Sequence, residues 1–215
     1  MLLALYDALN DDDDEVRDVG SAAVKSILGL ALVPIEAAKR LLEWLASTFT
    51  DSTAFKSIIT TRLVGARNPD ARWQPAEEQL SAALRVDDSL FVVEEQNLFI
   101  DEVREVKRWV SVYEATRWDT SDSLVKDLDA WLCGGLARLQ RLLEQDDGPL
   151  GWASNPQVFA VCSVLIRCSV AMASKGHASS NLQGSMRQVK EMLDANQTKH
   201  TSGLLTEPLE EVQMN

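Results

Sequence analysis

Apolar residues recur along this chain at the spacing of an α-helix. A first apolar stripe covers 2–9, a second 16–28, a third 34–45 and a fourth 55–63. Within each stripe the apolar positions lie three, four and seven residues apart, so they share one face of a helix. The segment 1–66 therefore predicts four helices joined by short loops, arranged as two antiparallel HEAT-like pairs.

Start and stop signals support the boundaries of the second and third helices. Asp12 and Glu15 form an acidic variant of a capping box, which predicts that the second helix begins there. Gly29 is placed to end that helix, because glycine adopts the left-handed conformation of a helix C-terminus without strain. Pro34 stands where a third helix would begin, in the first turn, where proline is tolerated.

The periodic pattern breaks after residue 66. Two X-Pro turn signals, Asn68-Pro69 and Gln74-Pro75, fall in this region. A short fifth helix is predicted over 75–84. The apolar run within 86–97 has the composition of a strand, but no second strand is available to pair with it. We interpret 86–97 as a buried loop or a short helical turn, and 67–97 as an irregular connection with one short helix.

Helical periodicity resumes at residue 98 and continues to about residue 195. The predicted helices cover 98–117, 122–144, 156–175 and 182–193. The third of these is apolar nearly all round, so we expect it in the middle of the packing. Gly134-Gly135 interrupts the helix before it, at a cost of about 1 kcal/mol per glycine relative to alanine. A close helix crossing at these glycines would compensate that cost.

These elements define a fold class. About nine helices without a paired strand predict an all-α, HEAT/armadillo-like helical-repeat stack, an α-α superhelix. The predicted organisation is HEAT-like helix pairs over 1–66, the irregular connection over 67–97, C-terminal helical repeats over 98–195 and a disordered tail over 196–215. The tail is assigned because its sequence is polar and without periodicity.

Charge limits the contacts that the protein can make with nucleic acid. The 215 residues carry a formal net charge of −12, so bare phosphate should repel the chain as a whole. One local exception is the segment 56–72, whose net charge is +3. The candidate RNA-contact residues are Lys56, Arg62, Arg67, Arg72 and Trp73, the last as a stacking surface. The alternative is a surface loop that balances its acidic flanks.

A second candidate site lies where the periodic pattern resumes. The residues are Glu94, Glu95, Asn97, Asp101 and Glu102, and we consider them candidate partner contacts. Two alternatives stay open. The acids could form a carboxylate pair for metal binding or catalysis, as in a small helical enzyme, or Asn97 could simply cap the helix that follows. No histidine lies nearby, which weakens the metal interpretation.

The sequence offers few other groups for chemistry. Cys133, Cys162 and Cys168 fall on apolar helices without a Cys-x-x-Cys pair, as expected of buried free thiols in a reducing compartment, and we predict a cytoplasmic location. No P-loop, Gly-x-Ser-x-Gly or Gly-x-Gly-x-x-Gly motif is present, so we predict no enzyme activity and no cofactor or metal. The longest apolar run, 158–173, is short for a bilayer and contains Arg167, so we expect no membrane span.

Two segments resemble known helical-repeat proteins. Residues 2–29 read LLALYDALNDDDDEVRDVGSAAVKSILG, which resembles a HEAT repeat: an apolar helix, an acidic turn, and Val-Arg at the start of a second helix. Such repeats bury their apolar faces only by stacking on neighbours. We therefore expect the chain to be the C-terminal piece of a larger solenoid.

The second resemblance is to one particular family. Residues 90–113 read LFVVEEQNLFIDEVREVKRWVSVY, and their acidic-acidic-x-Asn-Leu-Phe core resembles a signature from the C-terminal region of the THADA family, notably its fungal members. The resemblance implies a non-catalytic regulatory subunit that supports an FtsJ-like tRNA 2′-O-methyltransferase acting on the anticodon loop. The alternative is a generic HEAT-repeat adaptor for protein interaction with no RNA role.

Overall fold

The computed structural model describes residues 2–65, 73–84, 102–145 and 155–195. The described residues form nine α-helices and no strand. The helices are α1 (Leu2–Ala8), α2 (Asp14–Leu28), α3 (Pro34–Thr48), α4 (Thr53–Leu63), α5 (Ala76–Leu84), α6 (Glu102–Ala115), α7 (Ser123–Glu144), α8 (Pro156–Ser174) and α9 (Ser180–Ala195). The all-α helical stack expected from the periodicity is confirmed. The predicted tail and most of the predicted connection lie outside the described residues.

The local signals fix most helix ends, with one correction. The N-cap of α2 is Asp13, one residue later than the capping box predicts, and its side chain accepts from the backbone N–H groups of Glu15 and Val16. Gly29 ends α2 with φ 71° and donates its N–H to the Lys25 carbonyl at 2.8 Å. Pro34 occupies the first turn of α3, as predicted.

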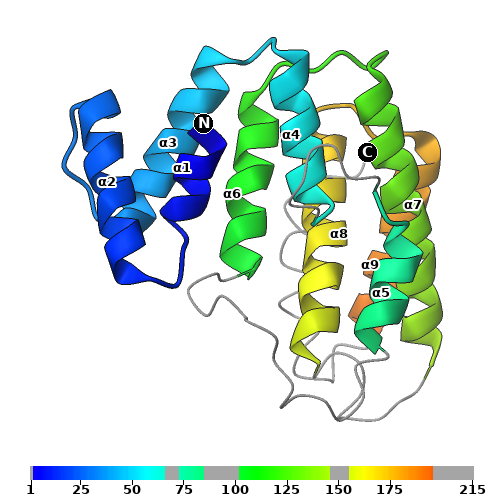
Figure 1. Ribbon diagram of the computed structural model, residues 1–215. Coiled ribbons are helices and arrows are strands. Elements are labelled where there is room, and N and C mark those ends of the chain that lie inside the picture. The colour runs from blue at the N-terminus through cyan, green and yellow to red at the C-terminus, as the bar shows by residue number, and fades with distance from the viewer. Residues whose placement is uncertain (1, 66–72, 85–101, 146–154, 196–215) are drawn as a thin grey trace.

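The packing order differs from the order of the helices along the chain. The sequence predicts α3 and α4 as one antiparallel pair, yet α3 packs mainly against α2 and α6, and α4 packs mainly against α6. Figure 1 shows α2 at one edge of the molecule, α6 between α3 and α8, and α7 near the opposite edge. On α6, the buried ring of Trp109 meets Tyr6 of α1 edge to face and lies beneath Arg62 of α4, so residues from both helices pack against it.

Helix α8 occupies the centre of the C-terminal half, as its apolar sequence predicts. It packs against α5, α6, α7 and α9. Its window Gln157–Ser174 is long and apolar enough to cross a bilayer, so the expectation that this run is too short was wrong. The packing gives a different reason for its composition, because 56% of that window is buried inside the protein.

A glycine at the crossing of α7 and α8 allows these helices to approach closely. A Cβ atom on Gly135 would overlap the Leu165 side chain and lie 2.9 Å from Ala76 Cβ. Its neighbour Gly134 is exposed, and a Cβ there would meet nothing within 4 Å. The close crossing predicted from the glycine pair is therefore confirmed for Gly135 alone.

Candidate functional site

A buried polar network joins α1 to α6. The hydroxyl of Tyr6 donates a short hydrogen bond to Glu105, and the indole N–H of Trp109 donates to the other carboxylate oxygen at 2.7 Å. Tyr6 and Trp109 also meet edge to face, with ring centroids 5.5 Å apart. Burial, together with the adjacent Glu105 carboxylate, raises the pKa of the Tyr6 phenol far above its usual range. The phenol therefore stays neutral and serves as a hydrogen-bond donor.

Arg108 extends this network to α3. Its guanidinium donates to the side-chain oxygen of Asn10 and to the backbone carbonyl of Ile35, both at 2.9 Å. Asn10 in turn donates to the Tyr6 carbonyl at 2.8 Å. The donors and acceptors satisfy one another. The arrangement is that of a structural clamp between helices.

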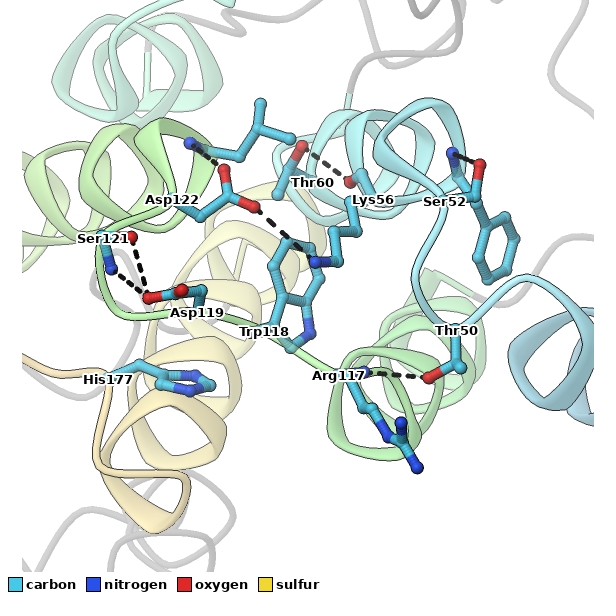
Figure 2. Close-up of polar contacts among 12 residues, drawn as sticks. Thr50, Ser52, Lys56, Thr60, Arg117, Trp118, Asp119, Ser121, Asp122 and His177 are labelled. Carbon is cyan, nitrogen blue, oxygen red and sulfur yellow. Dashed lines mark hydrogen bonds and ion pairs between the residues drawn. The ribbon is translucent and has the colours of Figure 1, made fainter.

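The two α4 cations of the predicted RNA patch are both engaged within the fold. Arg62 lies 2.8 Å from Asp7 of α1 and 5.9 Å above the ring of Trp109, and 14% of its side chain is exposed. Lys56 lies 3.8 Å from Asp122 and 5.6 Å from the ring centre of Trp118, with 13% of its side chain exposed. Figure 2 shows Lys56 directed at Asp122 beside Trp118.

Around Lys56, a second cluster connects three parts of the chain (Figure 2). The indole N–H of Trp118 donates to the Tyr113 carbonyl at 2.9 Å, and the two rings stack with centroids 4.7 Å apart. The Tyr113 hydroxyl lies 2.7 Å from Nδ1 of His177, which follows α8. Partial burial, with the charge of Lys175 nearby, lowers the pKa of His177 below its usual range. The cluster holds the neutral imidazole against α6.

Of the other three predicted RNA contacts, the structure describes only Trp73. Trp73 is half-buried and packs against the hydrophobic core, so only part of its ring is available for stacking. Arg67 and Arg72 lie outside the described residues. RNA contact by these five residues stays a prediction. Because Lys56 and Arg62 are engaged inside the protein, Arg67 and Arg72 are the better candidates for that contact.

The predicted partner contacts fall almost wholly outside the described part of the chain. Glu94, Glu95, Asn97 and Asp101 lie in the segment 85–101, which the structure does not describe. Glu102 is the first described residue of α6. Partner contact, the carboxylate pair and the Asn97 cap therefore all stay hypotheses.

Sequence reasoning missed a groove between α3 and α6. It has a volume of about 350 Å³, and most of its lining surface is apolar. The apolar floor includes Leu42, Ala46 and Val112, while Lys39 and Lys107 stand on opposite walls. The only feature of the sequence that points to this groove is a pair of lysines, one on each of two predicted helices. Nothing in the sequence indicates that these two helices are neighbours.

The remaining reactive groups among the described residues are inert or scattered. Burial raises the pKa of the Cys162 and Cys168 thiols to about 12, so neither is a thiolate at neutral pH. Cys133 is half-buried, and burial raises its pKa as well. Within the described ranges no three His, Cys, Asp or Glu side chains gather in a way that could hold a metal ion.

The stack of helices with its clamps and groove defines a helical-repeat protein. The sequence model of a family described as "Trm72 ARM-like repeat region" matches residues 43–215, which is most of the chain. The chain belongs to this family, and the resemblance to the C-terminal region of a THADA-type protein is confirmed. Neither a curated protein nor a solved structure matches the sequence.

Proposed function

We propose that this chain is the C-terminal part of a non-catalytic regulatory subunit that supports 2′-O-ribose methylation of the tRNA anticodon loop by an FtsJ-like methyltransferase. The observation that carries the proposal is membership of the Trm72 ARM-like repeat family, whose name points to tRNA modification. The signature in 90–113 supports the same assignment. The fungal origin suggested by that signature and the cytoplasmic location suggested by the free thiols belong to the proposal as well.

A helical stack can support methylation without chemistry of its own. Holding an enzyme and its substrate in one complex raises the effective concentration of each for the other. Fixing the anticodon arm relative to the methyltransferase also reduces the entropy lost when the ribose hydroxyl reaches the active site. The polar clamp between α1 and α6 suits this role because it fixes the angle between helices that are distant in sequence.

The test is to delete the gene and measure 2′-O-methylated anticodon-loop nucleosides by mass spectrometry of purified tRNA. We expect the modification to be lost, and we expect the tagged protein to co-purify with an FtsJ-like methyltransferase. Re-expression of the intact gene is the control. Unchanged methylation in the deletion strain would overturn the proposal.

RNA contact by this part of the subunit is a separate step with its own test. The double variant Arg67→Glu/Arg72→Glu should weaken crosslinking to tRNA severalfold, because it reverses two of the four cations in the basic segment 56–72. Arg62→Glu is the matched comparison, since its charge is engaged by Asp7. If the double variant crosslinks as well as the native chain, this basic segment does not bind RNA.

A generic HEAT-repeat adaptor with no RNA role is the second candidate. The net charge of −12 and the internal engagement of Lys56 and Arg62 favour it. An adaptor would co-purify with proteins other than a methyltransferase, and its deletion would leave tRNA methylation intact. The same deletion experiment therefore separates the two candidates.

A further inference from the structure

We propose that the groove between α3 and α6 docks an acidic amphipathic helix of a partner protein. The groove lies between two helices that pack on each other although they come from different parts of the chain, residues 34–48 and 102–115. Its lining is mostly apolar, with a volume that accommodates a few side chains of a docking helix. Amphipathic helices bind such grooves by inserting the apolar residues of one face.

The charge of the groove opposes the charge of the protein. Four basic and two acidic side chains line it, whereas the whole chain has a net charge of −12. The two acids, Glu36 and Glu43, are both bridged by Arg40 at 3.2 and 3.0 Å, so much of their charge is already compensated. A ligand in the groove therefore meets a local positive field in an otherwise acidic molecule.

Two lysines are the cations best placed for a ligand. Lys39 and Lys107 are exposed on opposite walls, and neither amino group has an ion-pair partner among the described residues. Arg108 is instead held by Asn10 and the Ile35 carbonyl, which fixes one end of the groove. Carboxylates on both edges of a docked helix would reach one lysine each.

The floor of the groove favours a protein helix over RNA. Leu42, Ala46 and Val112 supply aliphatic surface, which sugar and phosphate groups cannot use. None of the twelve groove-lining residues is aromatic, so the groove offers no platform for stacking bases. An apolar stripe with flanking acids matches the floor and the walls together. The inference does not depend on the identity of the methyltransferase, so it can fail or hold separately from the proposed function.

The experiment uses the full chain and a library of synthetic helical peptides. Each peptide carries leucine at i, i+3, i+4 and i+7, and its polar positions are varied among Glu, Lys and Gln. We expect selected binders to be rich in Glu. Fluorescence anisotropy should show that the double variant Lys39→Glu/Lys107→Glu binds these peptides about tenfold more weakly than the native chain does. Peptides with Lys in place of Glu should bind that variant better than they bind the native chain.

Two further variants separate the groove from general charge. Ser111→Trp places a large side chain at an exposed groove position and should weaken binding by more than tenfold, and Ala115→Trp replaces it if the first variant fails to fold. Lys126→Glu/Arg187→Glu changes net charge equally at exposed sites on α7 and α9 and should leave affinity unchanged.

Four outcomes would overturn the proposal. The first is that no peptide in the library binds, and the second is that Glu, Lys and Gln peptides bind equally well. The third is that binding survives both tryptophan variants. The fourth is that a single-stranded oligouridine RNA displaces the peptides and loses its own binding when a tryptophan fills the groove. The last outcome would assign the groove to RNA instead of a protein helix.

Discussion

Two junctions between helices, α1 with α6 and α7 with α8, are held by opposite kinds of contact. At the first, Glu105 accepts hydrogen bonds from Tyr6 and Trp109, so the fit depends on matched donors and acceptors. At the second, Gly135 admits Leu165, and the fit depends on shape alone. Hydrogen bonds are directional, so the first junction fixes the orientation of α1, whereas the second fixes how near α7 and α8 lie.

The largest effect should come from removing the shared acceptor of the polar junction. Glu105→Ala leaves two buried donors without a partner, and each unsatisfied donor costs about 1–3 kcal/mol. We expect the free energy of unfolding to fall by about 3 kcal/mol in urea titration, with faster amide exchange in α1. Glu114→Ala, an exposed position on the same helix, is the matched control. A loss no larger than that of the control would mean that the network does not hold the junction.

The next effect should come from filling the apolar junction. Gly135→Ala places a methyl group against Leu165 and Ala76, and overpacking of this kind costs about 1–3 kcal/mol, partly offset by the better helix propensity of alanine. We expect a net loss of about 1–2 kcal/mol in thermal or urea unfolding. Gly134→Ala at the adjacent exposed position should instead stabilise the protein by up to about 1 kcal/mol. Equal effects at both positions would contradict the close crossing.

A smaller effect is expected from the ion pair that reinforces the polar junction. A double-mutant cycle with Arg62→Met and Asp7→Asn should give a coupling energy below about 1 kcal/mol, because half of the Asp7 side chain is exposed. The pair Arg141–Glu77, in which both side chains are 51% exposed, is the comparison and should couple less. Raising the salt concentration should reduce both couplings. A coupling for Arg62 that is insensitive to salt would mean that packing on Trp109 dominates.

The smallest effect concerns pH. Burial lowers the pKa of His177 in the folded protein below the usual histidine value of about 6.5, so the unfolded chain binds more protons as pH falls below that value. The stabilisation is present above that pH and is lost progressively below it. We expect His177→Gln to flatten the dependence of unfolding free energy on pH below about 6.5. An unchanged slope would show that His177 does not contribute.

Local signals predicted helices well because each depends on residues close together in the sequence. Pro34, Gly29 and the apolar stripes each specify a turn or a face without reference to the rest of the chain. The single-residue error at Asp12 arose because four consecutive aspartates offer several possible caps, and the side-chain geometry of Asp13 decides between them.

The spatial neighbours were not predictable in the same way. The packing of α3 against α6 instead of α4 is accompanied by a hydrogen bond from Arg108 to the Ile35 carbonyl, which joins residues 73 positions apart. The groove with Lys39 and Lys107 exists only because of this pairing. For the same reason the sequence suggested that Lys56 and Arg62 were available to bind RNA. Their ion-pair partners, Asp122 and Asp7, are distant along the chain, so the sequence alone does not reveal them.

The central position of α8 has a consequence for biosynthesis. Its neighbours come from both sides of it in the sequence, from α5 at residue 76 to α9 ending at residue 195. Until α9 has been synthesised and has left the ribosome, this strongly apolar segment lacks its last cover. Exposed apolar surface of this kind favours aggregation, so we expect the nascent chain to be a substrate for chaperones at this stage.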